Sequence, residues 1–267
     1  MRIIHFSDPH AGGPAEDFLA YLDKRWVGVF NYTFQRRFRY NLKRLGHAVD
    51  YIVSTRPDVA VCTGDLTSSG QPGEFAKVVE LLKPIGEAKI PLLYLPGNHD
   101  CYVKRPKCVA AVRQAVHTLT QGREEFADFP LVRDFGEVEF FLVNTSRPSA
   151  LLFSGGYLSK ADSAAIEKWC EAPHLKPRIL LSHYPITEDH PILRFRHRLY
   201  GQKRAAELLA KREIDLMLCG HIHRPYRKVD ATGRGECCAG SVTLNGTMTE
   251  IDYDPETRNF TYNAVKI

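Results

Sequence analysis

Runs of apolar residues alternate along this chain with segments in which apolar residues recur at helical spacing. In residues 73–88, for example, Phe75, Val78, Leu82 and Ile85 recur every three or four positions, as in a helix with one buried face. The pattern predicts strands at 2–6, 59–62, 92–95, 139–143, 178–181 and 215–218, and helices at 40–54, 73–88, 106–118, 159–171 and 202–212. This alternation of strands and helices predicts a layered α/β fold.

The pattern changes after Gly220, where short strand-like pieces are separated by turn signals. Asn245-Gly246 and Asp254-Pro255 are such signals, and they predict a closing antiparallel meander. Its strands would be Cys237–Val242, Thr247–Tyr253 and Asn259–Lys266. No linker, internal repeat or low-complexity stretch interrupts the 267 residues, so we expect a single domain over 1–267.

The composition is that of an ordinary globular protein, with 44% hydrophobic and 25% charged residues. No apolar run approaches the length of a membrane span, and the first residues are too soon interrupted by polar ones to form a signal peptide. The seven cysteines are odd in number and include no C-x-x-C, which indicates reduced thiols. These features favour a cytoplasmic protein, with peripheral contact at the inner membrane face left open.

Polar residues follow the strand-like runs in five short motifs. They are Asp8-Pro9-His10, Gly64-Asp65, Gly97-Asn98-His99-Asp100, Ser182-His183 and Gly220-His221-Ile222-His223. Open α/β sheets collect their active sites at the C-terminal ends of strands. Glycines beside the polar residues let the backbone turn sharply without a side-chain clash.

Seven residues of these motifs could together hold two divalent ions. They are Asp8, His10, Asp65, Asn98, His183, His221 and His223. Carboxylate, carboxamide and imidazole ligands without a thiolate suit manganese, iron or zinc. Two such ions acidify a water molecule and neutralise charge that develops on phosphoryl oxygens, so the set indicates a hydrolase.

The order D-x-H, G-D, G-N-H-D, H and G-H-x-H, from Asp8 to His223, resembles the calcineurin-like metallophosphoesterase superfamily. The resemblance implies a four-layer α/β/β/α sandwich. It also implies two ligand sets that share a bridging Asp65: Asp8, His10 and His223 for one ion, and Asn98, His183 and His221 for the other. By the same likeness His99 would stand beside the leaving-group oxygen as an acid or charge stabiliser, and Asp100 would orient His99.

Residues 17–45 form a basic, aromatic insertion between the first two motifs. The segment holds seven Lys or Arg against two acids, an excess equal to the net charge of +5 of the whole chain, and eight of its residues are aromatic. This mixture is typical of an amphipathic element at a membrane surface, and it can also stack on nucleic-acid bases. An ordinary helix with its aromatic residues in the core is an equally open interpretation.

Four arginines are candidates for binding a second phosphate or a carboxylate of the substrate. They are Arg194, Arg196 and Arg198, which follow His183 in the chain, and Arg147, which follows a predicted strand. The alternative is a solvated basic loop.

A narrower resemblance rests on Lys24, Arg25, Gly28 and Asn31, in the pattern K-R-x-x-G-x-x-N, together with Gly97–Tyr102 and Ser154–Ser159. These stretches are similar to the UDP-2,3-diacylglucosamine pyrophosphatases of chlamydia-type bacteria. That likeness implies release of UMP from a nucleotide-linked lipid in lipid A biosynthesis. Other functions remain open: a soluble cyclic-nucleotide or general phosphodiesterase, a non-catalytic binding module, or a nuclease. The lack of an obvious appended DNA-grasping domain argues against nucleic acid as a partner.

Overall fold

Two β-sheets lie face to face in the computed structural model, which describes residues 1–151, 153–187 and 197–267. The first sheet has the order β13–β12–β1–β2–β3, with bounds Asn259–Lys266, Thr247–Asp254, Arg2–Phe6, Val59–Cys62 and Leu92–Tyr94. The second has the order β10–β11–β9–β7–β5–β4, with bounds Tyr226–Val229, Gly235–Cys238, Leu216–Cys219, Arg178–Leu181, Glu139–Leu142 and Leu131–Asp134. A small ladder joins β6 (Gly156–Tyr157) to β8 (Leu199–Tyr200).

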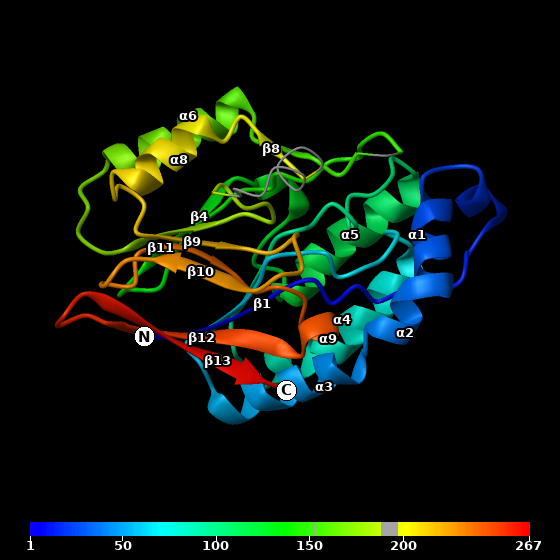
Figure 1. The fold of residues 1–267 in the computed structure, drawn as a ribbon, viewed down its shortest axis with the longest axis horizontal. Coiled ribbons are helices and arrows are strands. Elements are labelled where there is room, and N and C mark those ends of the chain that lie inside the picture. The colour runs from blue at the N-terminus through cyan, green and yellow to red at the C-terminus, as the bar shows by residue number, and fades with distance from the viewer. Residues whose placement is uncertain (152, 188–196) are drawn as a thin grey trace.

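Helices cover the outer face of each sheet (Figure 1). The first sheet is covered by α3 (Lys43–Thr55), α4 (Pro72–Glu87) and α5 (Pro106–Leu119), and the second by α6 (Lys160–Glu171) and α8 (Lys203–Ala210). Within the described ranges, the remaining helical pieces are η1 (Phe18–Tyr21), α1 (Arg25–Asn31), η2 (Tyr32–Arg36), α2 (Arg37–Arg39), η3 (Phe126–Asp128) and α9 (Val242–Asn245).

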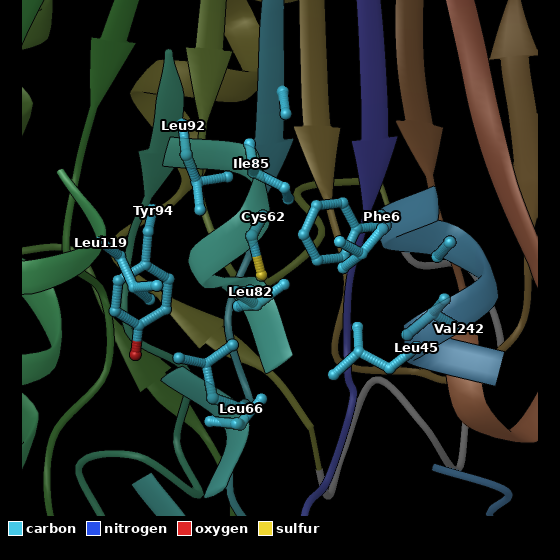
Figure 2. Packing of buried hydrophobic residues seen from close by; sticks show 14 of the residues in the cluster. Phe6, Leu45, Cys62, Leu66, Leu82, Ile85, Leu92, Tyr94, Leu119 and Val242 are labelled. Atoms are coloured by element: carbon cyan, nitrogen blue, oxygen red, sulfur yellow. The ribbon is translucent and has the colours of Figure 1, made fainter. Parts of the chain in front are cut away.

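The central strands bury side chains on both faces because both faces are covered. In β1, Ile4 and Phe6 pack against the helices of the first sheet, whereas Ile3 packs between the two sheets. Figure 2 shows the helix-side core, in which Phe6 from β1 and Cys62 from β2 lie among Leu45 of α3 and Leu82 of α4. The expected α/β/β/α sandwich is therefore confirmed.

The second sheet divides its residues in the same way. Phe140, Ile179 and Leu218 face the first sheet, while Phe141 and its neighbours Leu180 and Met217 face α6 and α8. Strands β1, β2 and β3 are parallel in the first sheet, and strands β5, β7 and β9 are parallel in the second. The polar motifs follow the C-terminal ends of these parallel strands other than β5.

The predicted C-terminal meander is correct only in part. The strands β12 and β13 form an antiparallel hairpin in the first sheet, but β11 pairs with β9 in the second sheet and is not part of a meander. Asn245-Gly246 does not form a hairpin turn. Instead Asn245 is the last residue of α9, and Gly246 ends that helix with a left-handed φ of 65°.

The insertion at 17–45 is built from η1, α1, η2, α2 and the start of α3, at one end of the sandwich (Figure 1). Arg25 anchors it, because this guanidinium is only 2% exposed and is paired with both Asp17 and Asp23. Gly28 lies against the loop after β2, since a Cβ at Gly28 would be 2.6 Å from the Cβ of Ser69. The basic residues of this segment are therefore not all solvated.

No helix among the described residues is both long and apolar enough to cross a membrane. All seven cysteines are buried and free, in agreement with the reduced thiols expected from the sequence.

Candidate metal centre

The polar motifs converge at the ends of β1, β2, β3, β7 and β9, where the chain turns out of both sheets. Five residues there have left-handed backbone conformations, which are uncommon for residues other than glycine. They are Asp8, His10, Asp65, His221 and His223, with φ of 54°, 49°, 54°, 69° and 51°. These sharp turns direct the five side chains toward one point.

Two glycines allow this convergence because a side chain would collide with a carboxylate. A Cβ at Gly97 would lie 2.2 Å from Oδ1 of Asp65, and a Cβ at Gly220 would lie 2.4 Å from Oδ2 of Asp8. The glycines of the motifs thus permit close approach of the chain to the acidic groups.

The candidate ligands form two groups that could each hold a metal ion. Asp8, His10, Asp65 and His223 have ligand atoms within 4.8 Å of one another, and so do Asp65, His183 and His221. Asp65 belongs to both groups. Asn98 lies beside the second group, with its Oδ1 3.1 Å from Nε2 of His183. This division is the same as the one that the resemblance implies.

The imidazoles of His10 and His183 are oriented as metal ligands usually are. Nδ1 of His10 lies 3.0 Å from the carbonyl of Thr67, and Nδ1 of His183 lies 2.7 Å from the carbonyl of Thr63. An N–H donated to each carbonyl leaves Nε2 of each ring with a lone pair. Both Nε2 atoms face Asp65 Oδ2, at 3.6 Å and 3.3 Å.

Two carboxylate oxygens of this cluster lack a hydrogen-bond donor within the described residues. Asp8 Oδ1 and Asp65 Oδ2 are buried and accept no hydrogen bond from the described part of the chain, although imidazole nitrogens lie nearby. Burial disfavours the charged imidazole of His183, but the Asp65 carboxylate outweighs burial and raises its pKa to about 9. A cation bound among these groups would relieve the same deficit, so the donor set fits divalent metal ions.

His99 follows β3 and turns its ring toward the cavity. Its Nδ1 lies 2.7 Å from the carbonyl of Ser68, which fixes the ring and leaves Nε2 toward the cavity. Burial and the nearby Arg36 guanidinium lower the pKa of His99 well below its usual value. The ring also stacks on Tyr102 at a centroid distance of 4.9 Å.

Asp100 has contacts that differ from the role expected for it. The carboxylate accepts hydrogen bonds from the backbone N–H groups of Leu66, Thr67 and Gly97, and from the hydroxyl of Tyr94. It therefore holds together the two loops that carry Asp65 and Asn98. Ser68, and not Asp100, makes the hydrogen bond that orients the His99 ring.

A cavity of about 260 Å³ opens over the cluster, and the insertion forms one of its walls. The residues that line it from the insertion are Lys24, Val27, Asn31 and Arg36. Leu151, Phe153 and His197 also line the cavity. Nδ1 of His197 lies 3.1 Å from Nε2 of His221.

Two of the four arginines expected to bind substrate, Arg147 and Arg198, are not part of the described lining of this cavity. Arg147 and Arg198 are exposed, and their guanidinium groups lie over the rings of Tyr157 and Tyr200, at 3.9 Å and 5.3 Å from the ring centroids. Binding of substrate by these two arginines therefore has no support from the described lining and stays a prediction. Arg194 and Arg196 lie outside the described residues.

The basic groups that do line the cavity, Lys24 and Arg36, come from the insertion. Lys24 donates to Ser149 Oγ at 2.7 Å and lies over the Tyr102 ring at 4.8 Å. Lys24 and Asn31 are two positions of the K-R-x-x-G-x-x-N pattern, so this pattern in the sequence pointed to two residues that line the cavity. Arg36 was visible there only as one of several basic residues.

Residues 1–225 match the sequence model of a family described as calcineurin-like phosphoesterase. The chain is 26% identical over 185 residues to a probable cyclic nucleotide phosphodiesterase of Rhodococcus erythropolis, a match that covers 67% of this chain and 56% of that protein. It is 26% identical over 210 residues to the 3',5'-cyclic adenosine monophosphate phosphodiesterase of Escherichia coli strain K12, covering 78% and 66%. The chain thus spans less than two thirds of the length of either relative.

Among solved structures, a dimetal phosphatase from Danio rerio is similar to this chain with a TM-score of 0.62 at 14% identity. The match covers 98% of this chain and 91% of that one. At this level of identity the likeness concerns the fold alone.

Proposed function

This chain belongs to the calcineurin-like phosphoesterase family, and we propose that it is a metal-dependent hydrolase whose substrate is a phosphodiester. The observation that carries the proposal is the pair of ligand groups that share the buried Asp65. Asp8, His10 and His223 would hold one ion, and Asn98, His183 and His221 the other. Bound there, two divalent ions supply electrophilic stabilisation of the phosphoryl group and a more acidic water.

The protein's own groups prepare the site around the ions. The carbonyls of Thr63 and Thr67 fix the tautomers of His183 and His10, so that the Nε2 lone pairs face the cluster. Asp100 fixes the loops that carry Asp65 and Asn98. His99 presents Nε2 to the cavity, where we place the leaving-group oxygen.

A soluble phosphodiester, such as a cyclic nucleotide, is the first candidate for the substrate. Both relatives described above are named as phosphodiesterases of cyclic nucleotides, the first as a probable one. The described cavity is small, at about 260 Å³, which suits a compact diester better than a large polymer. We also propose that the chain is one domain, because each ligand group draws on residues that follow strands of both sheets.

A nucleotide-linked lipid is the second candidate, and it is favoured by the exposed aromatic side chains of the insertion. Phe18, Phe34 and Phe38 expose 73%, 63% and 71% of their surface, and Trp26 and Phe30 are also exposed. Such a surface suits peripheral contact with a membrane. With UDP-2,3-diacylglucosamine as the substrate, the reaction would cleave a pyrophosphate bond and release UMP.

One experiment separates these candidates. The metal-free protein is reloaded with manganese, and initial rates are measured on bis(4-nitrophenyl) phosphate, cyclic AMP and UDP-2,3-diacylglucosamine in detergent. Hydrolysis of the soluble diesters that depends on the added metal supports the first candidate. Fast UMP release with slow attack on both diesters would replace it with the second, and no hydrolysis of any of the three would contradict the proposed function.

A further inference from the structure

Arg36 is the one guanidinium among the described cavity-lining residues, and it lies directly beside the candidate metal ligands. Its Nη2 is 3.2 Å from Nε2 of His99, and its Nη1 is 3.1 Å from Nδ1 of His10. Nδ1 of His10 also faces the carbonyl of Thr67 at 3.0 Å, and one nitrogen cannot both donate to that carbonyl and accept from Arg36. The hydrogen bond from Arg36 to His10 is therefore weak or absent when His10 is oriented as a ligand.

The charge of Arg36 has no carboxylate partner at ion-pairing distance within the described part of the chain. Its contacts there are two imidazoles and the ring of Tyr40, whose centroid is 5.6 Å away. Arg25, in the same insertion, pairs with Asp17 and Asp23. A half-buried guanidinium that faces imidazole rings in an open cavity is arranged to receive an anion.

The insertion holds Arg36 in place through close packing. Arg36 is the last residue of η2, a π-helical turn, and such turns often occur at functional sites. The ring of Tyr32, at the start of this turn, lies so close to Gly12 that a Cβ there would be 2.2 Å from it. Just after the turn, the hydroxyl of Tyr40 lies 2.9 Å from Nδ1 of His223. The turn is therefore fixed at both ends against the loops of the metal centre.

We infer that Arg36 binds a non-bridging phosphoryl oxygen of the substrate, and that the insertion thereby supplies a guanidinium that the other described cavity-lining residues do not provide. This inference rests on the proposed phosphodiesterase function for the identity of the natural anion. A guanidinium suits this task because its fixed, parallel N–H groups match phosphate oxygens. Arg36 would then neutralise part of the charge on the phosphoryl group.

The test compares Arg36→Ala and Arg36→Lys with the control Arg37→Ala. Arg37 is the next residue, is exposed, and lies over the ring of Phe38 outside the cavity. Three quantities are measured on each manganese-loaded protein: bound metal per chain, the dissociation constant for inorganic phosphate by calorimetry, and kcat/KM on bis(4-nitrophenyl) phosphate.

For Arg36→Ala we expect phosphate affinity and kcat/KM to fall about 10- to 100-fold while bound metal stays as in the wild type. Arg36→Lys should recover part of both losses, and Arg37→Ala should match the wild type. Unchanged phosphate affinity in Arg36→Ala, or loss of its metal, would overturn the inference. If the wild type hydrolyses no diester but binds phosphate through Arg36, the inference stands and the proposed function fails.

Discussion

Gly97 lies against the carboxylate of Asp65 so closely that any side chain at position 97 would overlap it. A Cβ there would be 2.2 Å from Oδ1 and 2.3 Å from the backbone N of Asp65. The loop after β3 therefore determines where the carboxylate shared by both ligand groups can lie.

Gly97→Ala should displace Asp65 and lower kcat/KM by about a hundredfold, because a displacement of about 1 Å at a reacting centre has that effect. Gly46→Ala is a matched control, since a Cβ at Gly46 in α3 meets nothing within 4 Å. That control should keep full activity and gain about 0.5 to 1 kcal/mol of stability from its helix propensity. Wild-type activity in Gly97→Ala would show that the close contact does not position Asp65.

Asp65→Ala should abolish activity and reduce the bound metal from two ions per chain, because both groups lose the ligand that they share. The variant is measured by elemental analysis after dialysis against manganese, with the exposed Asp50→Ala of α3 as the control. Turnover close to that of the wild type would contradict the assignment of Asp65 as a shared ligand.

His99→Ala should lower kcat about a hundredfold while both metal ions remain bound, because help from a positioned acid or charge donor is worth roughly that factor. His117→Ala serves as a control, since this exposed ring pairs with Glu125 on the outer surface. If His99→Ala also loses its metals, His99 is a ligand and its proposed role at the leaving group is wrong.

Glu74, buried in the first turn of α4, should make stability fall as pH rises. Burial raises its pKa to about 7 from an ordinary value of 4.5, so the folded protein binds a proton that the unfolded chain has lost. The stabilising effect of that proton is complete below pH 4.5 and is lost as pH rises toward 7, with a slope of about 1.4 kcal/mol per pH unit.

Glu74→Gln cannot ionise, so the slope of its unfolding free energy between pH 5 and 7 should be smaller than that of the wild type by about this amount. Denaturant melts in the presence of a chelator measure the slope without interference from metal binding. The exposed Glu80→Gln in the same helix should melt with the wild-type slope. Equal slopes in all three proteins would contradict the prediction.

Membrane contact through the insertion is tested by changing both Trp26 and Phe30 to serine. If these exposed rings enter the interface, co-sedimentation with vesicles of anionic lipid should fall at least tenfold. Leu175→Ser removes an exposed apolar side chain outside the insertion and should sediment as the wild type does. Failure of the wild type itself to sediment with vesicles would argue for a purely soluble substrate.

The regular elements of this fold could be predicted from local pattern, because the central strands are short and mostly apolar runs. Strands 59–62 and 178–181 have the predicted bounds, and α4 begins and ends within one residue of 73–88. Sheet membership after Gly220 could not be predicted in this way. The strand β11 runs parallel to β9 in one sheet while β12 pairs with β1 in the other, and only the packing between layers decides this.

The candidate ligands could be identified from sequence because each lies in a short motif after a strand. Arg36 could not, since its place in the cavity depends on a π-helical turn and on the packing of Tyr32 against Gly12. Arg198 shows the converse: it follows His183 in the chain, but its guanidinium lies over the ring of Tyr200 and not in the described lining of the cavity.

At the metal centre, the residues with left-handed backbone conformations favour the arrangement of the ligands but lower the stability of the fold. A residue other than glycine in this backbone conformation lowers folding stability by on the order of 1 kcal/mol, whereas glycine adopts the conformation without that cost. A glycine at His221, for example, would relax the backbone and remove a buried polar group, at the expense of a ligand. Selection for thermal stability alone would therefore disfavour these ligand residues. In a descendant without selection for hydrolysis, substitutions that make the protein more stable and inactive would accumulate.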